Sequence, residues 1–203
     1  KYDSGTDFER HQRSLEFSQV AIREMIAGLD AQGLMENTLI VITSDHGEEF
    51  FNGNFRGRGT TLSEETHLVP LIMYIRGQEI ALPPLEYARH IDIVPSILDI
   101  LGLAPEGLPL QGHSIFNNVE QRPVYMNTIG RLRSVGLVDN GVKTIHSLDT
   151  KLTRSGPMPF PGAEEILTLV NSDRHNHLVE KMKTFSIYNE AALRDRADSK
   201  DET

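Results

Sequence analysis

The stretch Leu39-Ile-Val-Ile-Thr-Ser-Asp45-His46-Gly-Glu-Glu49 decides the fold class of this chain. Its first five residues are rich in Ile and Val, which predicts a short strand buried on both faces of a parallel sheet. Ligands bind in the crevice beyond the carboxyl ends of such strands, and Asp45 and His46 fall there. Gly47 has no Cβ and permits a sharp bend, so that both side chains can turn toward one cation.

The next segment distinguishes a binding site from an ordinary turn. Asp-His-Gly by itself is also typical of a turn, because Asp often ends a strand and starts the next segment. The continuation is Gly57-Arg-Gly-Thr-Thr-Leu-Ser-Glu-Glu-Thr-His-Leu-Val-Pro-Leu-Ile72. It predicts a polar glycine-rich loop around Arg58, an acidic helix-like segment, and a second buried strand over residues 69–75. Together the two segments favour a site.

The order of these pieces resembles the sulfatase branch of the alkaline phosphatase superfamily. Two later stretches support the same resemblance, namely His90-Ile-Asp-Ile-Val-Pro-Ser-Ile-Leu-Asp-Ile-Leu-Gly-Leu103 and Gly112-His-Ser-Ile115. The resemblance implies an α/β fold: a layered α/β/α alkaline-phosphatase-like domain, here partial, followed by a small antiparallel β/α subdomain at the C-terminus. We expect the first part to cover residues 1–120 and the second residues 121–203.

The resemblance also indicates what this chain lacks. Members of the superfamily carry an N-terminal half that supplies the first metal-binding carboxylates and the nucleophile. This sequence has no cysteine, no Cys/Ser-x-Pro-x-Arg segment, and no Asp-rich strand before Asp45. We therefore expect a C-terminal fragment of a larger enzyme, inactive without its N-terminal half, which would be its partner.

Asp45 and His46 are the predicted metal ligands. A carboxylate oxygen and a neutral imidazole together suit several divalent cations. In the resembling enzymes this pair holds the metal between the nucleophile and the ester oxygen, and calcium is our first expectation, with manganese, magnesium and zinc left open. Glu48 and Glu49 are expected either to hydrogen-bond His46 and fix its ring or to be solvated loop acids.

Arg58 and His67 are the predicted catalytic residues. The planar guanidinium of Arg58, between two glycines, suits the oxygens of sulfate or phosphate. The resembling enzymes have Lys or His there, and Arg does not readily give up a proton, so His67 is the alternative proton donor. The competing interpretations are a solvated loop cation for Arg58 and a packed residue for His67. Arg56 is a fallback for the same anion contact, and Thr60 and Thr61 are expected either to donate to a substrate oxygen or to cap the following turn.

Composition narrows the class of partner. A net charge of −9 argues against nucleic acid, because phosphate binding needs clustered Lys and Arg. No segment approaches the roughly twenty apolar residues that cross a bilayer. The absence of cysteine excludes disulfides without excluding secretion. We expect a periplasmic or extracellular protein, whose parent could be membrane-anchored.

Periodicity and turn residues predict the remaining elements. We expect a helix over residues 8–33 ended by Gly33, a long polar loop over residues 48–61, and a helix after Asp92 ended by Gly102. Short strands are predicted at residues 123–128, 134–139 and 142–147, with a hairpin turn at Asp139-Asn-Gly141. A Pro-rich loop is predicted over residues 153–162, and helices over residues 163–170 and 176–184.

Two function classes remain open from the sequence. The first is a metal-dependent hydrolase of sulfate esters, with a phosphoethanolamine or phosphoglycerol transferase, or a phosphodiesterase, of the same superfamily as its variant. The second is a degenerate, non-catalytic binding module. The intact Asp45, His46 and Glu48 favour descent from an enzyme, and within that class the Gly-x-Gly-Thr-Thr segment favours a sulfatase.

Overall fold

The protein forms two compact units. The computed structural model describes residues 5–51, 54–59, 61–81, 85, 87–117, 122–128, 133–158, 168–170, 176 and 179–180, with the backbone alone at residues 54–56. One unit comprises Lys1–Ile80 with Ile129–Arg131, and the other comprises Ala81–Thr128 with Leu132–Thr203. All the predicted site residues belong to the first unit. The family-based division at residue 120 stays a prediction.

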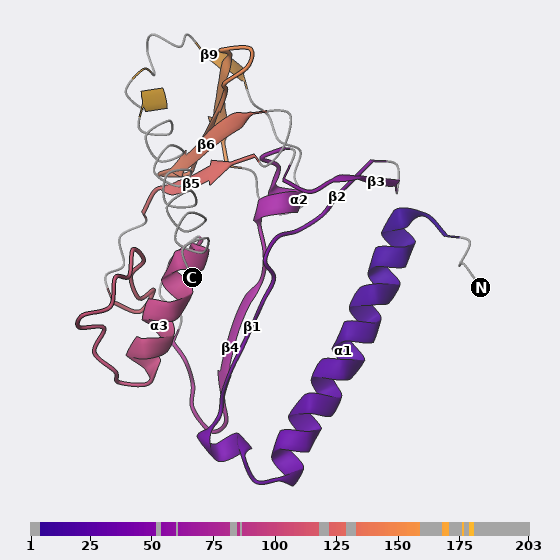
Figure 1. Ribbon diagram of the computed structural model, residues 1–203, viewed down its shortest axis with the longest axis vertical. Coiled ribbons are helices and arrows are strands. Elements are labelled where there is room, and N and C mark those ends of the chain that lie inside the picture. Colours follow the sequence, from indigo (N-terminus) through magenta and orange to yellow (C-terminus); the bar gives the residue numbers. More distant parts are fainter. Residues whose placement is uncertain are drawn as a thin grey trace, which may run out of the picture. The chain divides into compact units, whose positions relative to one another are not determined.

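The first unit opens with the long helix α1 (Asp7–Ala31), shown in indigo in Figure 1. A capping box starts it: the Thr6 hydroxyl accepts from the Glu9 backbone N–H, and the Glu9 carboxylate accepts from the Thr6 N–H. Gly33, with a φ of 70°, follows its end as expected. No residue of α1 is buried, and its exposed large apolar side chains are Phe8, Leu15, Phe17, Val20 and Met25.

The strand that leads into the Asp45-His46 turn differs from its expected setting. β1 (Leu39–Thr43) forms where predicted, after the short 3₁₀ helix η1 (Met35–Asn37). It pairs antiparallel with β4 (Leu71–Ile75), with Leu39 opposite Ile75 and Thr43 opposite Leu71. The expected parallel neighbour is absent among the described residues, and only Ile40 of β1 is buried. A run of apolar residues predicts a strand, but it does not determine whether the neighbouring strand is parallel or antiparallel.

The expected loop over residues 48–61 is partly a hairpin. β2 (Glu49–Phe51) and β3 (Asn54–Gly57) pair antiparallel, and a register shift lies between Glu49 and Phe50. The short helix α2 (Glu64–His67) follows, as the acidic segment predicted. The alternation of apolar and polar residues there is too short to predict a strand from sequence.

In the second unit, a buried carboxylate holds the segment that leads into a helix. The 3₁₀ turn η2 (His90–Asp92) leads into α3 (Ile93–Ile100), with Pro95 in its first turn and Gly102, at a φ of 65°, after its end. The buried Asp92 carboxylate accepts from the Arg89 backbone N–H and guanidinium and from the His113 backbone N–H. Burial raises the pKa of Asp92, but these hydrogen bonds outweigh it and hold the pKa below its usual value.

A close backbone approach and hydrogen bonds hold the Gly112-His-Ser-Ile115 segment against α3. A Cβ on Gly112 would lie 1.8 Å from the Ile91 carbonyl oxygen, so only glycine fits. The Ser96 hydroxyl accepts from the Ile115 N–H at 3.0 Å, and the Ser114 hydroxyl donates to Asp99 at 2.6 Å. These contacts give a structural reason for two of the motifs on which the family resemblance rests.

A five-stranded antiparallel sheet, in the order β5-β6-β7-β8-β9, completes the second unit. β6 (Ser134–Asp139) and β7 (Val142–Ser147) match their predicted bounds, and β5 is Val124–Asn127. Asn140 and Gly141 both have positive φ, which confirms the hairpin turn. The small antiparallel sheet expected at the C-terminus is therefore confirmed. Its core contains Val135, Leu137 and Val179.

Two expectations near the C-terminus were wrong. Residues 153–162 were expected to be a loop, but Thr153–Pro157 forms β8. Residues 163–170 were expected to be a helix, yet Thr168–Val170 forms β9, and residues 163–167 lie outside the described residues. The pairing of β8 with β7 overrides the local turn signals of its Gly and Pro. Most of the helix expected over residues 176–184 also lies outside the described residues.

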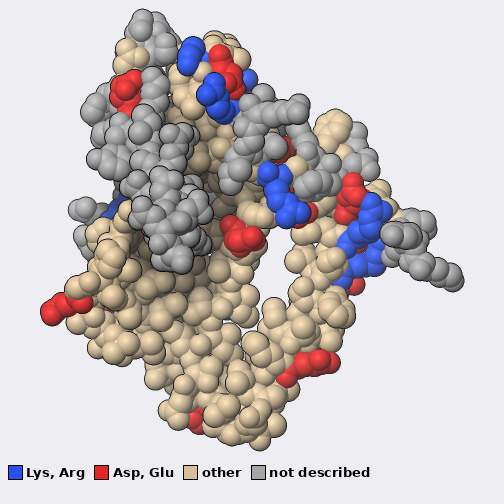
Figure 2. Space-filling model, viewed as in Figure 1, with Lys and Arg blue, Asp and Glu red and all other residues tan. Residues whose placement is uncertain are grey.

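The viewed surface mixes charges of both signs. Figure 2 shows the Lys and Arg side chains in small groups beside Asp and Glu, with uncharged surface between them. No helix among the described residues is both long and apolar enough to cross a bilayer.

Candidate metal and anion site

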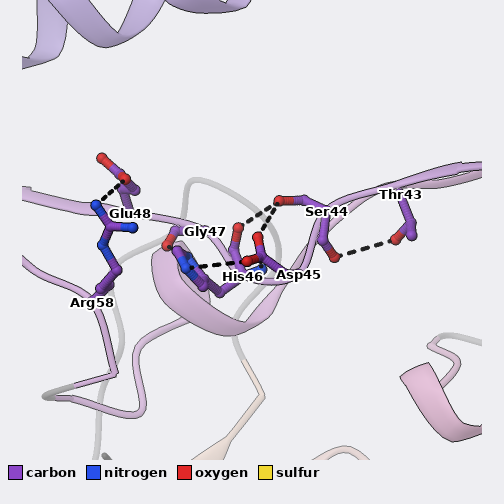
Figure 3. A network of polar contacts seen from close by, with 7 residues as sticks. All are labelled: Thr43, Ser44, Asp45, His46, Gly47, Glu48 and Arg58. Carbon is purple, nitrogen blue, oxygen red and sulfur yellow. Dashed lines mark hydrogen bonds and ion pairs between the residues drawn. The ribbon is translucent and has the colours of Figure 1, made fainter.

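Hydrogen bonds from its own side chains to its backbone hold the turn after β1 in shape. The Ser44 hydroxyl donates to the His46 carbonyl oxygen at 2.6 Å, and the Asp45 Oδ1 accepts from the His46 backbone N–H at 2.9 Å. An Asp that bonds the backbone just after it is typical of such turns. These bonds fix the carboxylate of Asp45 beside the imidazole of His46, as Figure 3 shows.

Gly47 is required by a close approach and not by an unusual φ. Its φ is not positive, so the bend does not need glycine for its backbone conformation. An added Cβ would lie 1.9 Å from the Glu65 carbonyl oxygen, however, and the Gly47 N–H donates to the Thr66 carbonyl at 2.9 Å. The turn is thus pressed against the backbone of α2. The sequence-based reason for this glycine is corrected accordingly.

Asp45 and His46 face one another through acceptor atoms. Asp45 Oδ2 lies 3.5 Å from His46 Nε2, and His46 Nδ1 lies 2.8 Å from the Gly47 carbonyl oxygen. A carbonyl only accepts, so this contact favours a proton on Nδ1, and the tautomer with that proton leaves the Nε2 lone pair on the side of the carboxylate. The His46 N–H also holds the pKa of Asp45 below its usual value, so the carboxylate is ionised at neutral pH.

This pair fits one divalent cation. Two lone pairs that face each other repel, and a cation between them, or a proton on Nε2, relieves the repulsion. Oxygen and nitrogen ligands bind common divalent ions at about 2.0 to 2.6 Å, which places two adjacent ligands roughly 3 to 3.5 Å apart. The Asp45 side chain is 83% exposed, so a cation can reach it from solvent. Within the described part of the chain, no cluster of three or more His, Cys, Asp or Glu could hold a metal. The two residues therefore fit as part of a ligand set.

Glu48 and Glu49 lie away from His46. The two ring nitrogens of His46 contact Gly47 and Asp45, and neither glutamate contacts them. Glu48 instead pairs with Arg58 and with His11 of α1. Glu49 is buried and accepts from the Thr61 hydroxyl at 2.8 Å. Each carboxylate is thus half-buried or buried and engaged with residues other than His46, and its role beside a bound metal stays a prediction.

Arg58 lies at the end of β3, next to the turn. Its neighbours Gly57 and Gly59 have φ values of 149° and 67°, a region that favours glycine. The guanidinium Nη2 lies 3.4 Å from Glu48 Oε1, and the side chain is 58% exposed. Figure 3 shows Arg58 and Glu48 on one side of the turn and Asp45 on the other.

His67 ends α2. Its Nδ1 lies 2.7 Å from the Thr66 hydroxyl and 3.3 Å from the Ser63 carbonyl, which anchors the ring to its own helix. The role of proton donor stays a prediction. Thr60 and the side chain of Arg56 lie outside the described residues.

His11 is the residue of this region that sequence reasoning missed. It lies in the helix predicted over residues 8–33, where it has no expected role, but its Nδ1 lies 3.7 Å from Glu48 Oε2 and its ring lies 5.3 Å from that of Phe50. Phe8, one turn earlier, meets Phe50 edge-on at 5.3 Å. The spacing of Phe8 and His11 at i and i+3 places them on one face of the helix. No local signal indicated which segment that face contacts.

Comparison with known proteins identifies the family. The sequence model of the family described as Sulfatase matches residues 3–103, which include the turn after β1, Arg58 and α3. Through these residues the chain belongs to the sulfatase family. The sulfatase resemblance inferred from the Asp-His-Gly segment and the residue 90–103 motif is thereby confirmed.

Solved sulfatases share the fold. The chain matches a putative sulfatase from Bacteroides thetaiotaomicron with a TM-score of 0.54 and 17% identity, over 75% of this chain and 36% of that one. It matches a 2-O GAG sulfatase with a TM-score of 0.53 and 18% identity, again over 75% of this chain and 36% of that one. At these identities the likeness supports the alkaline-phosphatase-like α/β fold alone.

One curated relative belongs to the wider superfamily. The multifunctional alkaline phosphatase superfamily protein PehA of Trinickia caryophylli is 34% identical over 80 residues, which are 38% of this chain and 15% of that protein. The sulfatase-family chain therefore spans about a third of the solved sulfatases and a smaller part of this relative.

Proposed function

We propose that this chain forms a metal- and anion-binding part of a metal-dependent, sulfatase-like hydrolase that acts on sulfate esters. The observation that carries the proposal is the pair of acceptor atoms, Asp45 Oδ2 and His46 Nε2, facing each other at 3.5 Å at the end of β1. Membership of the sulfatase family and the exposed guanidinium of Arg58 near the turn support it.

Asp45 and His46 would hold a divalent cation, for which calcium is our first candidate before manganese, magnesium or zinc. A bound divalent cation supplies Lewis acidity and neutralises charge on the transferred group. The carboxylate of Asp45 brings the negative charge that cation binding needs, and its lowered pKa keeps that charge at neutral pH. The Gly47 carbonyl holds the His46 tautomer that leaves Nε2 as a ligand.

Arg58 would bind the sulfate oxygens of the substrate. A guanidinium presents several N–H donors in one plane, which suits two oxygens of a tetrahedral anion. Arginine stays protonated, so we assign it binding and orientation and not proton transfer. His67 is proposed as the proton donor to the leaving oxygen, through the ring nitrogen that does not contact Thr66 and Ser63.

The nucleophile and the remaining metal ligands are proposed to lie on an N-terminal half of the same enzyme. The support is the extent of the match, since the chain covers 36% of each solved sulfatase. We propose that the fragment alone is inactive for this reason, and that the enzyme works in the periplasm or outside the cell.

Phosphate esters are the second candidate class. The relative in Trinickia caryophylli is named multifunctional and belongs to the wider superfamily. Sulfate and phosphate esters present similar tetrahedral anions, which Arg58 would contact in the same way.

Metal titration of the protein tests the metal-site half of the proposal. Calcium, manganese, magnesium and zinc are titrated separately, and binding is followed through the His46 ring nitrogens by NMR. Asp45→Asn is expected to weaken binding of the preferred ion at least about tenfold, because loss of a supporting group alone costs that much. Asp139→Asn, in the β6–β7 turn, removes the same charge elsewhere and is expected to have no effect. Unchanged affinity in Asp45→Asn refutes the metal site.

Hydrolysis by the full-length protein tests the substrate class. An aryl sulfate and an aryl phosphate of the same leaving group are compared, and the sulfate is expected to be turned over faster. Faster turnover of the phosphate favours the second candidate. No turnover of either by a full-length protein that binds metal overturns the enzyme proposal.

A further inference from the structure

The Glu48 carboxylate joins α1 to the arginine of the site. Its Oε1 lies 3.4 Å from Arg58 Nη2, and its Oε2 lies 3.7 Å from His11 Nδ1. The Glu48 side chain is only 22% exposed, whereas that of Arg58 is 58% exposed. A carboxylate fixed on the body of the unit thus contacts a guanidinium whose side chain is largely exposed.

The contact with Glu48 restricts the orientation of the Arg58 guanidinium. Its side chain is long and largely exposed, and the glycines on both sides contribute no side chain that could pack against it. An unrestrained arginine loses much rotamer freedom when it binds a ligand, which weakens binding. A carboxylate that orients the guanidinium beforehand reduces that loss.

Glu48 is itself held in place from α1. Phe8 and His11 of the helix both contact the ring of Phe50, two residues after Glu48, at centroid distances of 5.3 Å. The same helical face brings His11 to the second oxygen of Glu48. On the other side of Glu48, Gly47 is bonded to the Thr66 carbonyl. The backbone of Glu48 is therefore fixed before and after the residue.

A negative charge beside an anion site has two opposed effects. It orients Arg58, but it also repels an incoming anion and offsets the positive charge of the guanidinium. The geometry favours orientation, because one Glu48 oxygen lies beside the guanidinium Nη2 while the other faces His11 and the carboxylate is itself mostly buried.

We propose that Glu48 is a positioning residue, which holds the Arg58 guanidinium in the orientation that binds the oxygens of a sulfate ester. The inference rests on the proposed function in one respect, namely that Arg58 is the anion ligand. It adds a role for the glutamate that follows the Asp-His-Gly turn and for His11, which lies 37 positions earlier in the sequence.

Titration with inorganic sulfate tests this role. Sulfate is added to the protein against chloride at constant ionic strength, and binding is followed by NMR at the Gly57 and Gly59 amides and the Arg58 Nε–H. Arg58→Ala is expected to weaken sulfate binding at least about tenfold, and Glu48→Gln about fivefold. The double variant is expected to bind no more weakly than Arg58→Ala alone, because both changes act through one group.

Two further measurements separate positioning from a general structural effect. The order parameter of the Arg58 Nε–H is expected to fall in Glu48→Gln while the amide spectrum of the rest of the unit is retained. Glu24→Gln, on the exposed surface of α1, removes the same charge and is expected to leave sulfate binding unchanged. Should Glu48→Gln fail to fold, Glu48→Asp keeps the charge but shortens the reach, and weaker binding is expected there as well.

The outcomes are distinct. Tighter sulfate binding in Glu48→Gln shows that the carboxylate repels the anion and overturns the inference. Unchanged binding in Glu48→Gln or, where that variant does not fold, in Glu48→Asp also overturns it. If Arg58→Ala weakens sulfate binding in the same series, the anion-binding role of Arg58 stands. Unchanged binding in Arg58→Ala overturns the anion role itself, and with it the basis of the inference.

Discussion

Replacing Gly47 by alanine should break the contact that sets the metal-ligand turn against α2. The new Cβ would lie 1.9 Å from the Glu65 carbonyl oxygen, far inside van der Waals distance, so the turn must move away from the helix. That movement removes the hydrogen bond from the Gly47 N–H to the Thr66 carbonyl, now 2.9 Å long. Because His46 immediately precedes Gly47 and bonds its carbonyl, the Asp45 to His46 spacing changes too.

The expected cost follows from these two contacts. A lost backbone hydrogen bond contributes about 1 kcal/mol, and forcing a methyl group into a packed site costs about 1 to 3 kcal/mol. We therefore expect Gly47→Ala to lower the free energy of unfolding by roughly 2 to 4 kcal/mol. Divalent-cation affinity should fall about tenfold or more, as for other losses of support around a ligand.

Urea unfolding at 25 °C, hydrogen exchange of the amide at position 47, and cation titration measure these effects. Gly28→Ala is the matched control, because its Cβ would meet nothing within 4 Å in the interior of α1. That control should be neutral or more stable by about 0.5 to 1 kcal/mol. If Gly47→Ala unfolds at the same urea concentration as the wild type and binds the cation equally well, the close-approach argument is refuted.

Two predictions concern ion pairs of the second unit. Asp92→Ala leaves the half-buried Arg89 guanidinium without its carboxylate. It should lower the free energy of unfolding, measured by urea denaturation, by about 3 kcal/mol. A loss below about 0.5 kcal/mol would contradict the stabilising role of the Asp92 carboxylate. The Arg133 backbone N–H and guanidinium hold the pKa of Asp149 below its usual 3.8, so the pair stabilises the fold above that pH and loses its effect as the pH falls through the lowered pKa. Asp149→Asn should therefore be less stable than the wild type at neutral pH, and the difference in stability should vanish in acid. Thermal unfolding measured across pH tests this. A difference in stability that grows in acid would contradict the lowered pKa of Asp149.

Local sequence patterns predicted the elements that depend on local chemistry. The run of Ile and Val at β1, Gly33 after α1, Gly102 after α3 and the Asn140-Gly141 turn all lie where expected. Each depends on backbone preferences of a few neighbouring residues. β8 and the β2–β3 hairpin were missed, because their strands are stabilised by partners across the sheet and not by their own composition.

The features of the site also fall into those that local sequence predicts and those that distant segments determine. Asp45 and His46 could be found from sequence because they are adjacent, follow a strand and belong to a motif. The direction of β4 beside β1 and the purpose of Gly47 could not, because both depend on segments 18 to 36 residues away in the sequence.

The sequence by itself determined the family, the strand that leads into the turn, and the identity of the two candidate ligands. Only the tertiary structure decided that Glu48 faces Arg58 and His11 instead of His46. The physical reason is that a residue type determines what a side chain can bind, whereas its actual partner depends on which distant segment packs against it. Here that segment is the first turns of α1, which Phe8 and Phe50 bring to the site.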